Sequence, residues 1–423
     1  MKSWKQSPWS WIPSLYIAEG LPYVAVTTIA LVMFKRLGMS NTEITFYSSL
    51  IALPWVIKPL WAPFIEAIGT KRKWNLVLEL LMALCFLFIG YTINLKEVTL
   101  WSLFAFWILA FCSATHSISS TILYRINTSS KTRKILDNMC RNFFYLAGLA
   151  GTGLMVMFAG GLETYHRNIR HSWSLTFYIL GFIFGAIFVY HLFFLPRKPK
   201  DKAMPLQLDY RQHWYSFQYS THSFFHRPGA FMALLFLVFF RLPEALLTKI
   251  SPLFLLDSTH QGGLGLSTQE LGFTSGTVGV LALSLGGYIG AKAVEKKGFN
   301  KCFWPMVLLV TVPDILYVML CDWQIQNYAL INLFILLEQF GCGFGFIAYT
   351  RFIPFLATNP TKATHRATYA AVMALSLQVP GFIAGLLQEH VGYHNYFMIV
   401  LLGCIVTILV SAGVYLTPGY GRK

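Results

Sequence analysis

The chain has 423 residues, of which 56% are hydrophobic and only 12% are charged. Soluble domains contain about 25% charged residues, and a soluble core could not bury this much apolar surface. The composition therefore excludes an ordinary soluble protein and favours an integral membrane protein, in agreement with a mean hydropathy of +0.55.

Twelve apolar segments have the length that a membrane-spanning helix needs, about 20 residues. The first six lie near 10–34, 42–65, 75–93, 98–124, 140–160 and 173–195. The other six lie near 229–256, 268–291, 302–320, 327–350, 366–388 and 394–417. A β-barrel would need strands of alternating hydrophobicity, and the sequence shows no such period. The predicted fold class is therefore an all-α integral membrane protein with twelve transmembrane helices.

The formal net charge of +16 follows the expected topology. If the N-terminus is cytoplasmic, the cytoplasmic connections hold most of the Lys and Arg residues. The opposite connections hold only Lys35, Arg36, Lys96, Arg167 and Arg170. This asymmetry is the positive-inside pattern, and it predicts that both termini are cytoplasmic. The basic charge is thus interpreted as a topology signal and not as a nucleic-acid-binding surface.

The two halves of the chain resemble each other. The polar segment 196–228 separates a bundle at 1–195 from a bundle at 229–423, with six spans in each. LGMSNTEI at 37–44 matches LGLSTQEL at 264–271, and LYR at 123–125 parallels YTR at 349–351. The first pair contains two S-x-x-E capping boxes, which favour helix starts. The pattern indicates a duplicated six-helix bundle joined by a cytoplasmic linker.

This arrangement resembles the major facilitator superfamily. The resemblance implies a substrate site near the midplane between the two halves and transport by alternating access. The loop APFIEAIGTKRKW after the second span resembles a short signature of that superfamily, an acid followed by a basic cluster, with glutamate where aspartate is usual. It implies a role in conformational gating for Glu66, Lys71, Arg72 and Lys73.

A closer resemblance concerns the AmpG-type muropeptide permeases. LPWVIKPLWAPFIE at 53–66 is similar to their LPY-x-x-K-F-LWAP-x-x-D stretch, and GLP at 20–22 resembles their first-helix motif. SATH at 113–116 resembles their fourth-helix SATQ, but Ser117 and Thr121 stand where that motif continues with acids. The resemblance implies a proton-coupled permease of the bacterial inner membrane that imports an anionic amino-sugar or muropeptide-like solute. Because relatives of this family also carry siderophores, a siderophore or another organic anion is the alternative substrate.

Ionisable residues inside the spans are the candidate site residues, because each is costly in hydrocarbon and tends to face a cavity or a partner. We expect the cations Lys58, Arg241 and Lys249 to bind substrate carboxylates. The acids Glu19, Glu244 and Glu338 are candidate proton carriers. Tyr23, Trp55, His116 and Gln339 are further candidate substrate contacts. Glu79 and Asp314 are weaker candidates.

Structural interpretations remain open for several of these residues. Lys58 can snorkel or pair with Glu19, Arg241 and Glu244 can form a structural pair at i, i+3, and His116 can be a satisfied core residue. The glycines after Glu338 favour tight helix packing. Tryptophans near span ends favour interfacial anchoring, Trp173 among them.

The sequence contains no HExxH, GxxxxGK[ST] or GxSxG motif, so we expect no enzyme, metal or cofactor. An integral-membrane acyltransferase using His116 is the alternative from a different class. The expected partners are a small anionic solute, protons and the lipid bilayer, without nucleic acid, and the expected oligomeric state is a monomer.

Overall fold

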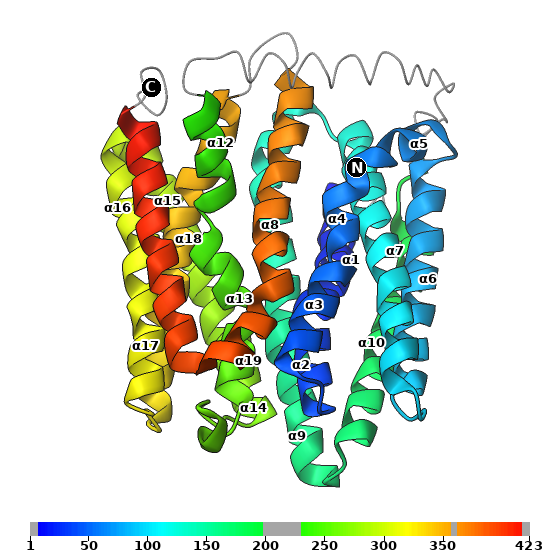
Figure 1. Ribbon diagram of the computed structural model, residues 1–423. Helices are drawn as coiled ribbons and strands as arrows, with labels where there is room; N and C mark the ends of the chain where they lie inside the picture. The colour runs from blue at the N-terminus through cyan, green and yellow to red at the C-terminus, as the bar shows by residue number, and fades with distance from the viewer. Residues whose placement is uncertain (1–6, 198–229, 357–361, 417–423) are drawn as a thin grey trace. The chain divides into compact units, whose positions relative to one another are not determined.

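The computed structural model describes residues 7–197, 230–356 and 362–416, and every regular element within these ranges is a helix. Figure 1 shows them in chain order. The first half contains α1 (Ile12–Val24), α2 (Ala30–Arg36), α3 (Asn41–Ile51), α4 (Leu53–Ile57), α5 (Ala62–Ala67), α6 (Lys71–Thr92), α7 (Val98–Asn127), α8 (Ser130–Gly148), α9 (Val156–His166) and α10 (Ile169–Phe194). The second half contains α12 (Ala230–Phe239), α13 (Leu242–Leu256), α14 (Thr268–Leu271), α15 (Val280–Lys297), α16 (Phe299–Thr311), α17 (Ile315–Asp322), α18 (Tyr328–Leu356) and α19 (Lys362–Leu416).

Within the described residues, ten helices are long and apolar enough to cross a membrane. The second span is divided into α3, α4, a 3₁₀ turn at Lys58–Leu60 and α5, so none of its pieces reaches that length. The eleventh and twelfth spans appear as one element, α19, which is interrupted at Gly392 by a φ of 77°. With these two features counted, the helices correspond to the twelve predicted spans. Prolines at 54 and 59 explain the divided span, because proline removes a backbone donor and crowds the preceding turn.

The chain forms two compact units. Unit 1 comprises Met1–Met39, Leu50–Leu208 and Thr268–Gly276, and unit 2 comprises Ser40–Ser49, Asp209–Ser267 and Thr277–Lys423. Each half of the sequence therefore contributes a short segment to the other unit, and both segments include the start of a span. The predicted linker at 196–228 lies outside the described residues except for its first two positions.

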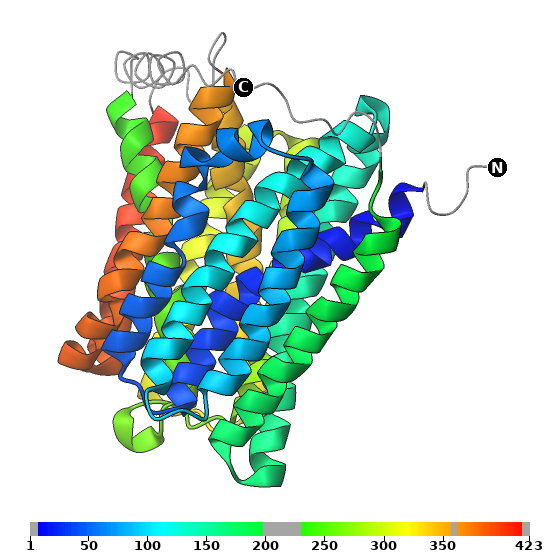
Figure 2. The same ribbon diagram turned by 90° about the vertical axis from the view of Figure 1, so that its right-hand side faces the viewer.

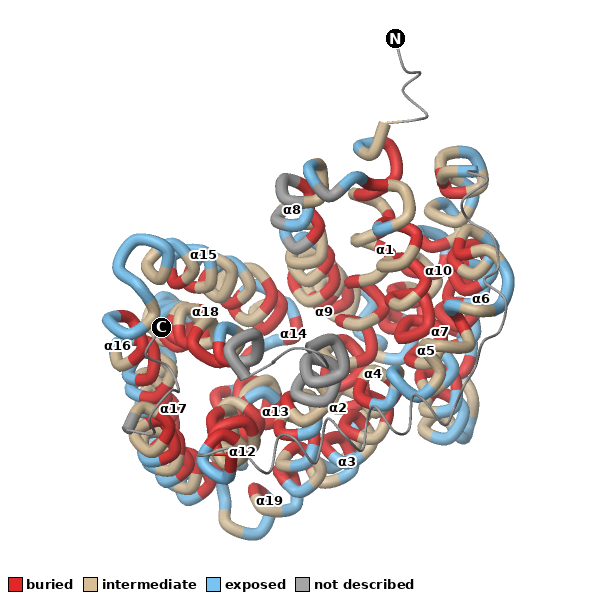
Figure 3. Tube along the Cα trace, turned by 90° about the horizontal axis from the view of Figure 1, so that it is seen from above, coloured by how far each residue is buried: buried red, intermediate tan, exposed pale blue. Residues whose placement is uncertain are grey.

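Unit 1 is built around α6, which packs against both α7 and α10, while α1 packs against α8. These helices lie side by side in Figures 1 and 2. Its core contains fully buried aromatic rings, including Phe86, Phe106 and Phe177. Seen from above in Figure 3, buried residues line the helix sides that face neighbours in the same unit, and exposed residues lie on the outer sides.

Unit 2 packs α15 and α16 against α18, and α12 and α13 against α19. Glycines make the close approach possible, as the sequence predicted. A Cβ added at Gly341 would lie 2.0 Å from the Leu309 carbonyl oxygen, and one at Gly343 would lie 2.0 Å from the Leu283 oxygen. The backbones of these helices are thus separated by less than a side chain.

Candidate transport site

Lys58 lies where the second span is interrupted. α4 ends at Ile57, and the 3₁₀ turn that follows begins with Lys58. The half-buried ammonium donates a hydrogen bond to Ser117 Oγ on α7 at 3.4 Å. One turn further along, Trp61 Nε1 donates to Thr115 Oγ1 of the same helix at 3.2 Å. The interrupted span is therefore fixed to α7 by polar side chains.

Glu19 of α1 contacts the same helix, α7, at a different residue. Ser120 Oγ donates to Glu19 Oε2 at 3.2 Å, and the Glu19 carboxylate interacts electrostatically with Lys58. Ser117 and Ser120 lie three residues apart, so they share a face of α7. The AmpG resemblance leads one to expect an acid at 117. A hydroxyl there binds the Lys58 ammonium without neutralising it, which leaves its charge available to an anionic ligand.

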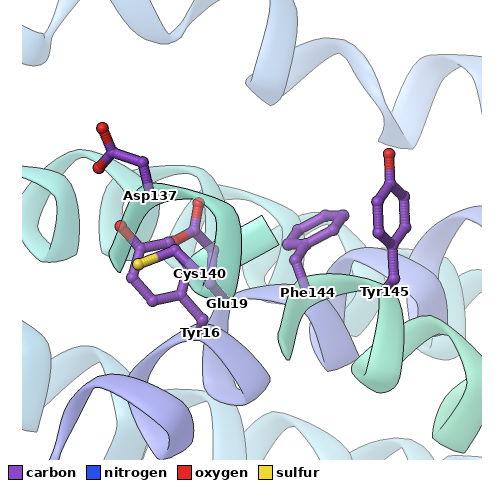
Figure 4. Close-up of a pocket in the computed structure, with 6 residues that line it drawn as sticks. All are labelled: Tyr16, Glu19, Asp137, Cys140, Phe144 and Tyr145. Carbon is purple, nitrogen blue, oxygen red and sulfur yellow. The ribbon is translucent and has the colours of Figure 1, made fainter. Parts of the chain in front are cut away.

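Two pockets in unit 1 share the residues Tyr16 and Asp137, and one of them is also lined by Glu19. One of about 350 Å³ is lined by residues of α1 and α8, namely Tyr16, Glu19, Asp137, Cys140, Phe144 and Tyr145. Figure 4 shows Glu19 grouped with Tyr16 and Cys140, with Phe144 and Tyr145 further along α8. A second pocket of about 490 Å³ is also lined by Tyr16 and Asp137 and adds Arg125 and Arg133. A solute in these pockets would meet both carboxylates and guanidinium groups.

The aromatic candidates Tyr23 and Trp55 contact each other. Their ring centroids lie 5.1 Å apart in an edge-to-face arrangement, and Phe144 lies 5.9 Å from Tyr23. Phe144 also lines the smaller pocket. Edge-to-face packing holds these rings in a fixed orientation.

His116 lies on α7 next to Ser117, but its side chain is fully buried. Its Nε2 lies 3.1 Å from Glu79 Oε1 on α6. The imidazole is therefore enclosed between helices and is not accessible to a solute in this structure.

In unit 2, Arg241 forms an ion pair with Glu244. Arg241 Nε donates to Glu244 Oε2 at 2.8 Å, and a second hydrogen bond joins Nη2 to Oε1. The guanidinium also lies 4.7 Å from the centre of the Phe346 ring. The seventh span is interrupted just here, between α12 and α13, and Arg241 is the N-cap residue of α13. Arg241 thus forms an ion pair with an acid of its own span, whereas the hydrogen bond of Lys58 is to a hydroxyl group.

Lys249 lies two turns further along α13 and is 5% exposed. Its Nζ donates to Ser48 Oγ at 3.0 Å, so a residue from the second span contacts it inside unit 2. A Cβ added at Gly381 would lie 3.3 Å from Lys249 Cε, which shows how closely α19 approaches this side chain.

Glu338 and Gln339 of α18 lie together. Gln339 Nε2 donates to Glu338 Oε2 at 2.9 Å, and Tyr317 OH donates to the same oxygen at 3.4 Å. Asp314 accepts a bond from Cys404 Sγ at 3.2 Å. In the part of the chain that the structure describes, neither Glu338 nor Asp314 forms an ion pair with lysine or arginine.

The comparisons with known proteins agree with this architecture. The family model described as "Major Facilitator Superfamily" matches residues 15–385, most of the chain. The chain belongs to the major facilitator superfamily. It is 24% identical over 408 residues to "Putative transporter AmpG 4" of Rickettsia felis, covering 94% of each chain. It is 22% identical over 389 residues to the "Anhydromuropeptide permease" of Escherichia coli K12, covering 91% of this chain and 75% of that one.

Solved structures of this superfamily share the fold. A D-xylose–proton symporter aligns with a TM-score of 0.68 at 13% identity, covering 98% of both chains. A structure of a proton-dependent oligopeptide transporter aligns with a TM-score of 0.69 at 11% identity, covering 95% of this chain and 97% of that one. The chain is therefore a multi-pass membrane transporter with an AmpG-like sequence.

The superfamily signature lies in the loop between α5 and α6. Lys71 is buried, and its Nζ donates to the Glu66 carbonyl oxygen at 2.8 Å and to that of Gly69 at 3.2 Å. Arg72 Nη2 donates to the Leu192 oxygen at 2.7 Å, near the end of α10. Lys73 and Glu66 are exposed to solvent. Lys71 and Arg72 thus fix the loop to backbone carbonyls.

His191 and Ser14 were not among the site residues predicted from the sequence. His191 Nδ1 lies 2.7 Å from Glu79 Oε1, and Ser14 Oγ lies 2.8 Å from His191 Nε2. The signal was present, because His191 is a titratable residue within the apolar run FVYHLFF of the sixth span.

Proposed function

We propose that this protein is a proton-coupled secondary transporter of the bacterial inner membrane that imports an anionic amino-sugar or muropeptide-like solute by alternating access. The observation that carries the proposal is the setting of Lys58. It lies in a segment that resembles the AmpG lysine motif, and it contacts a hydroxyl group where that motif leads one to expect an acid.

The cations support an anionic substrate. Lys58 and Lys249 are both bound by serine hydroxyls, which orient an ammonium without cancelling its charge. Muropeptides carry lactyl and peptide carboxylates that such cations would bind. Arg241, Tyr23, Trp55 and Gln339 are the other proposed substrate contacts, whereas the predicted contact His116 is left out because its side chain is fully buried against Glu79. The similarity to the anhydromuropeptide permease of E. coli supports the muropeptide class.

The acids support proton coupling. Glu19 adjoins a pocket and lies near Lys58, so its charge would respond to an incoming anion. Glu338 is held by neutral donors, and Glu244 by Arg241. We assign proton binding to these three carboxylates, gating to the loop with Glu66, Lys71, Arg72 and Lys73, and a cytoplasmic location to both termini.

The test is uptake of a labelled disaccharide-tripeptide muropeptide into proteoliposomes, with and without an inward proton gradient. We expect accumulation only with the gradient. If folded protein takes up no muropeptide, a siderophore or another organic anion becomes the substrate to test next. If uptake is independent of the gradient, the proposed coupling is wrong.

A further inference from the structure

A second group of titratable residues lies inside unit 1, apart from the pockets. It consists of Glu79 on α6, His116 on α7 and His191 on α10, and we call it the Glu79 cluster. All three side chains are 0% exposed, and both histidines contact the same carboxylate oxygen, Oε1, at 3.1 and 2.7 Å. A fully buried acid with two histidine partners is costly to maintain in a membrane protein. The proposed function does not yet use it as a unit.

The hydrogen bonds determine where protons lie. Each imidazole must donate to Glu79 Oε1 if the carboxylate is ionised, so His116 carries its proton on Nε2 and His191 on Nδ1. His191 Nε2 then accepts from the Ser14 hydroxyl at 2.8 Å. In this state the cluster holds two neutral imidazoles and one carboxylate. Its net charge is −1.

The same positions accept one more proton without any movement of heavy atoms. Ser14 Oγ lies 3.2 Å from the Trp11 carbonyl oxygen and can donate there instead of to His191. His191 Nε2 can then carry a proton and donate to Ser14 Oγ. The cluster becomes an imidazolium, a neutral imidazole and a carboxylate, with no net charge. The added proton thus removes the net charge of the cluster, and a net charge is costly in an apolar interior.

The hydrogen bonds within the Glu79 cluster do not satisfy all of its polar atoms. Within the described residues, Glu79 Oε2 and His116 Nδ1 are buried and make no hydrogen bond to protein. Buried polar networks that serve only to hold helices together usually satisfy every donor and acceptor. Glu79 Oε2 and His116 Nδ1 are thus two further positions at which the cluster can hold a proton.

Further titratable groups lie on the helices and turns of unit 1 that carry the cluster or pack against them. They are Tyr16, Glu19, Tyr23, Lys58, Lys71, Arg72, Lys73, Cys85, Tyr91, Cys112, Tyr124, Arg125, Arg170, His171, Tyr178 and Tyr190. Lys58 and Glu19 contact α7 at Ser117 and Ser120, which are next to His116 and one turn beyond it.

We propose that the Glu79 cluster is a proton-binding site of the transport cycle and exchanges its proton with the cytoplasm through the Ser14 hydroxyl. This rests on the proposed function. Ser14 is the third residue of α1, and His191 lies three residues before the end of α10, both next to termini or loops that the charge pattern places in the cytoplasm. On uptake, Ser14 gives its hydroxyl proton to His191 Nε2 and receives one from water. On release, both transfers reverse.

The first experiment measures protonation directly and needs no substrate. Full-length protein with ¹⁵N-labelled histidines is placed in lipid nanodiscs, and its imidazole signals are followed from about pH 5 to about pH 9. His116→Gln and His191→Gln assign the two buried signals. We expect one signal to change from a neutral tautomer to the doubly protonated form as the pH falls, and to lose this transition in Glu79→Gln. Single neutral tautomers at every pH would overturn the proposal.

The second experiment separates proton coupling from solute binding. Proteoliposomes with Glu79→Gln, His191→Gln or Ser14→Ala are assayed for gradient-driven muropeptide accumulation and for counterflow exchange, which needs no gradient. We expect Glu79→Gln and His191→Gln to lose accumulation and keep exchange, and Ser14→Ala to slow accumulation. The matched controls are Glu97→Gln and His171→Gln, whose residues are exposed. Accumulation at the wild-type level by Glu79→Gln would contradict the assignment.

The two experiments also distinguish this proposal from the proposed function. If wild-type protein accumulates no muropeptide but the histidine transition is present, the substrate is wrong and the proton site stands. If wild-type protein accumulates muropeptide and the histidines do not titrate, the proton site is wrong and the proposed function stands. If a variant does not fold, the wild-type titration decides by itself.

Discussion

The second and eighth spans occupy equivalent places in the two repeats, but they are joined to their neighbours by different means. In unit 1, the interrupted second span is bound to α7 by Lys58 and Trp61 through hydroxyl groups. In unit 2, α15 of the eighth span packs backbone to backbone on α18, where a Cβ at Gly286 would lie 2.2 Å from the Phe340 oxygen. The two repeats thus join equivalent helices by different contacts, through polar side chains in unit 1 and through glycine in unit 2.

This difference indicates that the contact of the second span with α7 can bind a ligand, whereas the contact of α15 with α18 serves only helix packing. A proline-interrupted segment with an unneutralised cation keeps polar groups that a solute can bind. A glycine contact excludes any solute, because no space remains between the two backbones. Only one of the two equivalent junctions is therefore suited to substrate binding. The predictions that follow test this contrast.

The largest effect is expected from Lys58→Ala. Removing the cation should abolish muropeptide uptake in proteoliposomes, because the hydroxyl of Ser117 cannot itself bind a carboxylate strongly. The protein should remain in the membrane at wild-type abundance. Lys96→Ala, at an exposed loop lysine, is the matched control and should transport normally. Wild-type uptake by Lys58→Ala, at matched abundance, would refute a substrate role.

The next effect concerns the locally neutralised cation of unit 2. Glu244→Gln leaves the Arg241 guanidinium buried without its carboxylate, which should destabilise the protein by about 3–5 kcal/mol. Thermal unfolding of purified protein measures this loss. The double variant Arg241→Gln, Glu244→Gln should recover much of the stability but not the uptake. If the double variant also recovered uptake, Arg241 and Glu244 would have only a structural role.

A smaller effect is expected at the glycine contact. Gly286→Ala should destabilise the protein by about 1–3 kcal/mol, since the added methyl group overlaps the Phe340 carbonyl. Gly287→Ala is the matched control, because its Cβ would lie 3.6 Å from the Gly343 oxygen, an ordinary contact. Thermal unfolding of both variants decides the point. Equal stability of the two would mean that the packing of α15 on α18 yields easily.

The smallest effect is expected at the start of the second span. Ser40 Oγ accepts from the Glu43 backbone amide at 3.2 Å, and Glu43 Oε2 accepts from the Ser40 amide at 3.1 Å, so the predicted capping box is present. Ser40→Ala should cost about 1 kcal/mol. Glu43→Gln keeps the box and should be neutral. A larger loss in Glu43→Gln than in Ser40→Ala would assign the stabilisation to the charge and not to the cap.

Much of this architecture was predictable from local features. Span length, the interruption of the second span and the close packing at Gly341 and Gly343 follow from hydropathy, proline and glycine, which act on the chain within a few residues. The pair of Arg241 and Glu244 was equally predictable, because residues three apart meet on one helical face.

Predictions that depended on a partner elsewhere in the chain were less successful. Trp173 was expected to anchor a span at the membrane interface, but its ring is fully buried and its Nε1 donates to Glu163 at 2.7 Å. Its position near a span end is compatible with both roles. Which role applies depends on what packs against that face of α10.

The sequence by itself determined the membrane class, the twelve spans, the repeat and the AmpG likeness, since each is encoded in local hydropathy, charge or motif. Only the tertiary structure decided that Lys58 meets Ser117, that Ser48 contacts Lys249 and that His116 and His191 share the Glu79 carboxylate. These partners lie between 37 and 201 residues apart in the chain. Hydropathy indicates that a helix face is buried, but the packing of helices selects the residue it meets. That selection determines which charges are neutralised and which remain to bind a solute or a proton.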